Sequence, residues 1–182
     1  MQNPPVSPIL IFLVGARASG KTTVGRALAR RLGLPFVDTD AAVTSAAGKT
    51  VAAIVAAKGW PAFRQQESAA LRATVAKYPQ GAVIATGGGM VLAVENRRFM
   101  RERGVVFYLE ATAPLLVARL TCSPLASQRP SLTGKGVAAE MKQVLAHRAP
   151  LYLEAAHHRL DAALPLEHLC EAAAALLPPA AE

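Results

Sequence analysis

The sequence predicts an α/β fold in which helices flank a parallel sheet. Short apolar segments alternate with longer helical patterns along the whole chain, and this alternation is typical of right-handed β-α-β units. Residues 9–14, ILIFLV, are continuously apolar and rich in branched side chains, as expected of a central strand that is buried on both faces. In such a sheet the functional groups gather at the carboxyl ends of the strands.

Five segments fit the strands of this sheet. Residues 9–14 form the first, and LPFVDTD at 34–40 predicts a short second strand that ends in two carboxylates. GAVIATGGG at 81–89 predicts a third strand that runs into three glycines, and VVFYLE at 105–110 predicts the fourth. HHRLDA at 157–162 predicts a short last strand.

Helical patterns fill the intervals between the strands. Gly33 is expected to end the first helix, and Gly-Trp-Pro at 59–61 to break the second. A proline also lies inside the pattern of 137–156, and an apolar stripe from Leu166 to Leu177 marks the closing helix. The expected helices cover 21–33, 52–78, 93–104, 113–122, 137–156 and 166–177.

The segment SPLASQRPSLTGKG at 123–136 has a different character. It holds Pro, Ser and Gly without an apolar period, and structureless loops of about 14 residues in compact domains are often lids or binding loops. The length of 182 residues suits one domain. We therefore expect a single domain over 1–182 with a lid at about 122–137.

Composition and charge limit the partners. The chain carries 20 Lys and Arg against 12 Asp and Glu, which gives a formal net charge of +8. The basic residues are scattered, and aromatic residues, at 5% of the chain, are few for stacking on bases. Small polyanions such as phosphates and carboxylates therefore explain the charge better than nucleic acid does.

Two features indicate the compartment. Residues 9–14 are too few to cross a bilayer, which takes ~20 apolar residues, and no positive charge precedes them as in a signal peptide. Cys122 and Cys170 have neither metal-ligand nor disulfide-framework spacing. We therefore expect a reduced, cytoplasmic protein without a membrane segment.

GARASGKT at 15–22 matches the P-loop pattern G-x-x-x-x-G-K-S/T in full. The glycines permit a tight turn whose N–H groups face phosphate oxygens, and the next helix presents its positive end there. Lys21 is expected to reach the β- and γ-phosphates, and the Thr22 hydroxyl to bind Mg²⁺. A plain glycine turn is the alternative, but a strand precedes this loop and a helix follows it, as the motif requires. The residues expected at the nucleotide are Gly15, Ala18, Ser19, Gly20, Lys21, Thr22 and Thr23.

The acid that would accompany Mg²⁺ is not at the end of the third strand. That strand ends in Thr86 and three glycines, so Asp38 at the end of the second strand is the nearest candidate. Helix capping is the alternative for Asp38 and for Asp40. Two carboxylates two residues apart could serve two partners, the metal and a substrate hydroxyl.

Glycines 87–89 and three arginines complete the candidates. Three glycines at a strand end suit the close approach of a ligand to the backbone, although a plain turn also fits. Arg64, Arg129 and Arg148 lie where a helix or loop could aim a guanidinium inward, and this group is the natural partner of a carboxylate or phosphate. A solvated surface charge is the alternative for each arginine.

Jointly, these motifs resemble the shikimate kinase family, and they cover nearly the whole chain in the family's order. The RPSLTGK form and the arginine in the P-loop are most similar to the type II enzymes of enteric bacteria. The matching segments are GARASGKTT at 15–23, FVDTD at 36–40, FR at 63–64, TGGG at 86–89, RPSLTGK at 129–135 and HRAPLY at 147–152.

The resemblance implies a fold and a reaction. The fold is the P-loop NTPase fold of the nucleoside monophosphate kinase type, with a five-stranded parallel sheet and a mobile lid. The reaction is transfer of the ATP γ-phosphate to the 3-hydroxyl of shikimate, in chorismate and aromatic amino acid biosynthesis. Mg²⁺ would be the cofactor, ATP and shikimate the partners, and a monomer the active form.

The resemblance also implies the roles of the site residues. Asp40 would bind the reacting hydroxyl as base or orienter, and Asp38 would join Thr22 in the magnesium shell. Arg64 and Arg148 would clamp the shikimate carboxylate. The remaining roles implied are Lys21, Asp40 and Arg129 in catalysis, Gly87, Gly88 and Gly89 at the shikimate pocket, and Arg119 and Arg129 at ATP.

One residue departs from the family's P-loop. Ala18 stands where glycine is common, and we expect the alanine to be tolerated if this position keeps a negative φ.

Two other functions fit parts of the pattern. A related P-loop kinase acting on gluconate or a nucleotide would share the fold, but the DTD, FR, GGG and RAPLY segments suit a carboxylated polyol and not a nucleobase. A P-loop protein that binds nucleic acid or acts as a switch would have a clustered basic face and would tolerate loss of Arg64 and Arg148.

Overall fold

The computed structural model describes residues 9–122 and 136–179. Within these residues five strands form one parallel sheet in the order β2-β3-β1-β4-β5, which confirms the predicted α/β class. The strands are β1 (Ile9–Val14), β2 (Phe36–Asp38), β3 (Gly81–Ala85), β4 (Val105–Glu110) and β5 (His158–Asp161).

Seven α-helices occur in the described part of the chain, most of them within a few residues of the predicted ranges. No helix there is long and apolar enough to span a membrane. The helices are α1 (Lys21–Leu32), α2 (Thr39–Ala47), α3 (Val51–Lys77), α4 (Val94–Arg103), α5 (Ala113–Thr121), α6 (Val137–Ala155) and α7 (Leu166–Ala175), with a 3-10 turn, η1, at Met90–Leu92.

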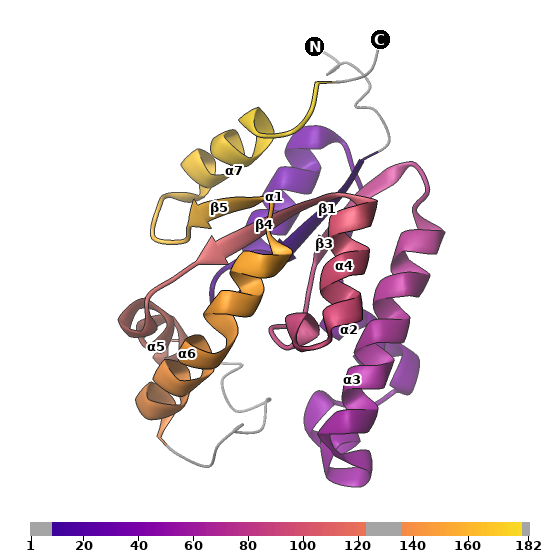
Figure 1. The fold of residues 1–182 in the computed structure, drawn as a ribbon, viewed down its shortest axis with the longest axis vertical. Helices are drawn as coiled ribbons and strands as arrows, with labels where there is room; N and C mark the ends of the chain where they lie inside the picture. Colours follow the sequence, from indigo (N-terminus) through magenta and orange to yellow (C-terminus); the bar gives the residue numbers. More distant parts are fainter. Residues whose placement is uncertain (1–8, 123–135, 180–182) are drawn as a thin grey trace.

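β1 occupies the middle of the sheet, as its apolar sequence predicts. It pairs with β3, where Ile11 lies opposite Val83, and with β4, where Phe12 lies opposite Val106. A parallel sheet must be covered on both faces. Helices α1 and α7 pack together on one face, and α4 and α6 lie side by side on the other (Figure 1). This cover leaves the carboxyl ends of the strands for the site.

Glycine and proline act where the sequence predicts. Gly33 ends α1 in the left-handed conformation, with φ of 66°. Gly59, with φ of 76°, breaks α3 just before Pro61. Pro150 lies inside α6. The break in α3 is important for the site because two aromatic residues follow it.

Two predictions are wrong in detail. The second strand ends at Asp38 and not at Asp40, because the Asp38 side chain caps a helix, α2, that begins at Thr39. The apolar stripe of α7 is buried in its middle, but Leu166 and Leu176 are exposed. Residues 123–135 of the predicted lid lie outside the described residues.

Candidate active site

Two pockets lie at the carboxyl ends of the strands. The first, here called the P-loop pocket, is lined by residues of the loop after β1 together with Asp38 and Arg119. The second, here called the arginine pocket, lies between α3 and α6 and is lined by Arg64 and Arg148. Among the described residues, three line both pockets: Arg17, Asp40 and Gly88.

The loop after β1 makes the tight turn that its glycines predict. Gly15 and Gly20 have φ of 147° and 102°, and a Cβ at Gly15 would lie 2.8 Å from the Leu109 carbonyl oxygen. Gly20 precedes α1, and no side chain caps the helix there. The first N–H groups of a helix that has no cap favour an anion. The turn and the helix start therefore fit a phosphate.

Ala18 is the exception in this loop. Its φ is 62°, so the condition of a negative φ, on which tolerance of the alanine was expected, is not met. The path of the loop between the glycines at 15 and 20 imposes this conformation on an L-residue, at a cost of roughly 1–2 kcal/mol. Because Ala18 also lines the P-loop pocket, the strain lies in the lining of that pocket.

Lys21 folds back on its own loop. Its Nζ donates to the carbonyl oxygens of Gly15 at 2.9 Å and Ala16 at 2.7 Å, and Ser19 Oγ lies 3.4 Å away. The lysine is buried, yet it lines the P-loop pocket. It brings an ammonium charge to that pocket, and an anionic oxygen is a stronger acceptor for it than a neutral carbonyl.

Asp38 uses its two carboxylate oxygens for different partners. The Thr22 hydroxyl donates to Oδ2 at 2.8 Å. Oδ1 accepts from the N–H groups of Asp40 at 3.0 Å and Ala41 at 3.3 Å, which caps α2. Capping and proximity to Thr22 are therefore compatible for Asp38. Asp40 is not the cap; it lies in the first turn of α2 and lines both pockets.

Arg64 lies beside two aromatic rings and a buried carboxylate. Its guanidinium is 5.0 Å from the centroid of the Trp60 ring and 5.5 Å from that of Phe63. It forms an ion pair with Glu67, one helical turn further along α3. A Cβ at Gly89 would overlap this guanidinium, so the position of Arg64 depends on the glycine.

The carboxylates of Glu67 and Asp40 meet at Gly87. A Cβ on this glycine would overlap an oxygen of each, and the Gly87 N–H donates to the Thr39 hydroxyl at 3.0 Å. Burial raises the pKa of Glu67 above its ordinary value; Arg64 opposes this shift and the Asp40 carboxylate adds to it. The arginine pocket thus contains two carboxylates as well as three arginines, Arg17, Arg64 and Arg148.

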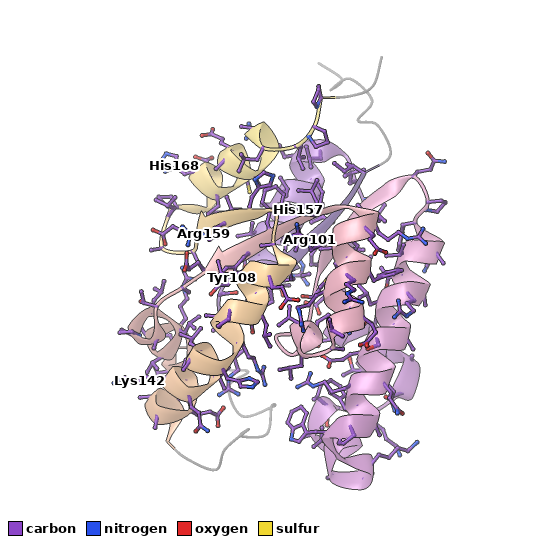
Figure 2. The ribbon with its side chains drawn as sticks, viewed as in Figure 1. Arg101, Tyr108, Lys142, His157, Arg159 and His168 are labelled. Carbon is purple, nitrogen blue, oxygen red and sulfur yellow. The ribbon has the colours of Figure 1, made fainter. Side chains whose placement is uncertain are left out.

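The Gly88 carbonyl accepts two hydrogen bonds from α6. Arg148 Nη1 donates at 3.1 Å and the Tyr152 hydroxyl at 2.6 Å. Tyr152 is fully buried and stacks on Tyr108 of β4 with 5.1 Å between ring centroids; Tyr108 is labelled in Figure 2. Burial raises the pKa of Tyr152 to about 12, so its hydroxyl stays protonated and remains a donor.

Arg119 joins the P-loop to the end of the sheet. Its Nη1 donates to the Ser19 carbonyl at 3.1 Å, and its Nη2 donates to the Ala162 carbonyl, just after β5, at 2.7 Å. The residue lines the P-loop pocket, so its predicted place near the nucleotide is reasonable on geometric grounds.

The predicted site residues separate into these two pockets, and a few lie behind the lining. Gly15, Ser19 and Gly87 are buried and do not line either pocket; Gly15 and Ser19 belong to the turn of the P-loop, and Gly87 lies against the Asp40 carboxylate. Arg129 is outside the described residues. The P-loop pocket is lined by Ala18, Gly20, Lys21, Thr22, Thr23, Asp38 and Arg119, and the arginine pocket by Arg64, Gly88, Gly89 and Arg148, with Asp40 in both.

Sequence reasoning missed several residues that line the arginine pocket or lie next to it. Glu67 could have been found from its spacing, because it lies three residues after Arg64 on one helix and such residues are neighbours. Tyr152 lies four residues after Arg148 in the same way. For Trp60, the sequence indicated only a helix break at Gly-Trp-Pro 59–61, and nothing marked it as a pocket residue.

Known proteins resemble this chain over most of its length. A family model described as shikimate kinase matches residues 17–175. Shikimate kinase 2 of Syntrophotalea carbinolica is 54% identical over 167 residues, which are 92% of this chain and 95% of that protein. Shikimate kinase 2 of Yersinia enterocolitica is 52% identical over 161 residues, 88% of this chain and 91% of that protein.

A solved structure gives the same result at the level of the fold. The shikimate kinase from Acinetobacter baumannii, in complex with shikimate, superposes with a TM-score of 0.85 at 32% identity, and the match covers 92% of each chain. The chain belongs to the shikimate kinase family.

Proposed function

We propose that this chain transfers the γ-phosphoryl group of ATP to the 3-hydroxyl of shikimate and produces shikimate 3-phosphate and ADP. The observation that carries the proposal is the position of Asp40, which lines both the P-loop pocket and the arginine pocket. A carboxylate at this junction can contact a hydroxyl held in one pocket and aimed at a phosphate held in the other. Membership of the family supports both substrates and the place in chorismate and aromatic amino acid biosynthesis.

ATP would occupy the P-loop pocket. The start of α1 and the turn at 15–20 would hold the phosphates, and Lys21 would exchange its bonds to carbonyl oxygens for bonds to phosphate oxygens. Arg119 would lie near the base. Arg129 keeps its proposed place at the phosphates on the resemblance alone.

Shikimate would occupy the arginine pocket. Arg64 and Arg148 would bind its carboxylate, since a guanidinium makes paired hydrogen bonds with that group. Trp60 and Phe63 would cover an apolar part of the ring. Gly88 and Gly89 would let the substrate approach the backbone. A nucleobase has no carboxylate to use two arginines, which argues against a nucleotide as acceptor.

The reaction is a direct displacement at phosphorus. The 3-hydroxyl oxygen of shikimate forms a bond to the γ-phosphorus, and the bond from that phosphorus to the β-γ bridging oxygen breaks, so that ADP leaves with the electron pair. Asp40 orients the hydroxyl and accepts its proton. Lys21 offsets the negative charge on the phosphate oxygens, and positioning with charge neutralisation is most of what phosphoryl transfer requires.

We propose Mg²⁺ as the cofactor, held by Thr22 and Asp38. Their oxygens are 2.8 Å apart at the edge of the P-loop pocket, and Mg²⁺ prefers oxygen ligands. No group of three His, Cys, Asp or Glu suited to a metal occurs in the described residues, which fits an ion held by one or two carboxylates and by substrate phosphates. When bound, the ion would neutralise phosphate charge.

We further propose that residues 1–182 form one kinase domain with a lid at about 122–137, active as a cytoplasmic monomer. The high coverage of relatives supports a single domain. Both cysteines are free thiols, which supports a reducing compartment.

A coupled assay of ADP release tests the proposed reaction. We expect turnover with ATP and shikimate, and only background with gluconate or AMP as the acceptor. Absence of shikimate-dependent ADP release would refute the proposal, and turnover with gluconate alone would favour a related kinase on the same fold.

A further inference from the structure

Arg17 has a position that the P-loop motif does not explain. It occupies one of the variable places of the motif, where any residue satisfies the pattern. Yet the residue lines both the P-loop pocket and the arginine pocket, a position that among the described residues only Asp40 and Gly88 share. The junction of the two pockets therefore contains an arginine as well as a carboxylate.

Glu140 of α6 holds this arginine. Arg17 Nη2 lies 3.0 Å from Glu140 Oε1, and the two side chains are 18% and 2% exposed. Glu140 lies in the first turn of α6. Met141 follows it directly and lines the arginine pocket. The ion pair thus connects the phosphate loop with the helix that also supplies Arg148.

A buried carboxylate is costly to keep charged unless a cation is beside it, and a buried pair is a weak source of stability. Such a pair restrains position, because movement of the guanidinium away from Glu140 would take a cation from a carboxylate that is 2% exposed. Within the described residues, Glu140 is the acidic partner recorded for Arg17. The pair therefore restrains where the arginine lies relative to both pockets.

The junction also presents an electrostatic problem. The Asp40 carboxylate and an incoming γ-phosphate are both anionic, and they repel each other at short range. A cation between them would reduce this repulsion and would stabilise the charge on the phosphoryl oxygens during transfer.

We propose that Arg17 contacts the transferring phosphoryl group, and that Glu140 is a positioning residue that holds the Arg17 guanidinium at the junction of the two pockets. This inference rests on the proposed function. Arg17 is then a catalytic residue for the chemical step, and Glu140 affects that step through Arg17.

A double-mutant cycle in kcat tests the proposal with wild type, Glu140→Gln, Arg17→Met and the double variant. We expect Glu140→Gln to lower kcat roughly 10-fold or more, since a small misplacement of a catalytic group has effects of that size, with little change in either KM. In the Arg17→Met background the same change should cause no further loss of kcat. Glu154→Gln is the control on the same helix as Glu140, because Glu154 of α6 pairs with Arg97 of α4 at 2.8 Å and neither residue lines a pocket.

Each outcome decides the question. If Glu140→Gln lowers kcat by the same factor in the wild-type and the Arg17→Met backgrounds, the positioning role is overturned. It is also overturned if Glu140→Gln leaves kcat unchanged and lowers thermal stability alone. If Glu140→Gln does not fold, Glu140→Asp keeps the charge and withdraws it from the arginine, and it should show the same loss of kcat in a folded protein. A wild-type chain without shikimate turnover would refute the proposed function itself, and that result needs no variant.

Discussion

Substitution of Tyr152 by Phe tests whether its hydrogen bond to the Gly88 carbonyl leaves Arg148 available to bind a substrate carboxylate. The Gly88 carbonyl has two donors, Tyr152 at 2.6 Å and Arg148 at 3.1 Å. When Arg148 turns to a substrate carboxylate, the tyrosine still satisfies the carbonyl. In Tyr152→Phe, Arg148 is the remaining donor from α6 to the Gly88 carbonyl. When Arg148 binds the substrate carboxylate, the carbonyl loses this donor as well. The variant should therefore bind shikimate more weakly while it retains normal chemistry.

The size of the effect follows from the burial of the site. Leaving a buried acceptor without a partner costs about 1–3 kcal/mol. A cost of about 1–2 kcal/mol corresponds to a factor of roughly 5–30 in KM for shikimate. The KM for ATP and kcat should change little, because Tyr152 lines neither pocket. Thermal unfolding should show a loss of about 1 kcal/mol from the hydrogen bond itself.

Steady-state assays of ADP release with each substrate varied provide the measurement. Tyr108→Phe is the control, since Tyr108 is the other ring of the stack and makes no recorded hydrogen bond to Gly88 among the described residues. The reasoning is refuted if Tyr152→Phe and Tyr108→Phe raise the KM for shikimate equally, or if Tyr152→Phe raises the KM for ATP as much as that for shikimate.

Four further predictions follow from the site. Arg64→Met should raise the KM for shikimate about 10-fold or more with little change for ATP, because a hydrogen bond to a charged group contributes about 1.5–3 kcal/mol; an equal rise in both KM values would argue against a carboxylate contact. Ala18→Gly should raise the unfolding temperature by relieving a φ of 62°, since the left-handed conformation costs an L-residue roughly 1–2 kcal/mol and glycine loses part of that gain in chain entropy; a lower unfolding temperature would contradict this. The pKa of Glu67 is raised above 4.5, so the folded state holds this proton more tightly than the unfolded chain does, and the stability that it contributes is lost as pH rises through the raised pKa. The midpoint temperature of unfolding of Glu67→Gln should therefore rise relative to that of wild type as pH increases from 4.5 to neutral. A difference between the two midpoints that does not change with pH would exclude this linkage. Thr22→Val should need more Mg²⁺ for half-maximal turnover, whereas an unchanged titration would exclude Thr22 as a ligand.

The sheet and the P-loop could be predicted because their signals are local. The continuous apolar run at 9–14 predicts β1 with its bounds, and the glycines and lysine that follow predict the loop. The boundary after β2 was wrong because a three-residue strand offers too little periodicity. Asp38 caps α2 and so sets where this helix begins. In the sequence alone, Asp38 and Asp40 are equivalent candidates for that cap.

The arginine pocket was only partly predictable, because its residues meet through the fold. The burial of Glu67 depends on the place where α3 passes Gly87, and no pattern within the helix shows this contact. The pairing of Arg17 with Glu140 joins residues more than a hundred positions apart. The sign of φ at Ala18 is likewise set by closure of the loop and not by the residue.

The strand order has a consequence for how acceptors can change in this fold. In the proposed function the loop after β1 holds the phosphoryl donor, and the loop after β3 carries the glycines at the acceptor; β1 and β3 are hydrogen-bonded neighbours. Adjacent strands lie about 4.8 Å apart, so backbone hydrogen bonds fix the separation of the two loops independently of side chains. The arginines proposed to recognise the acceptor, Arg64 and Arg148, lie on α3 and α6, outside the sheet. Substitutions on these two helices can therefore change which alcohol is accepted while the distance over which the phosphoryl group travels stays the same.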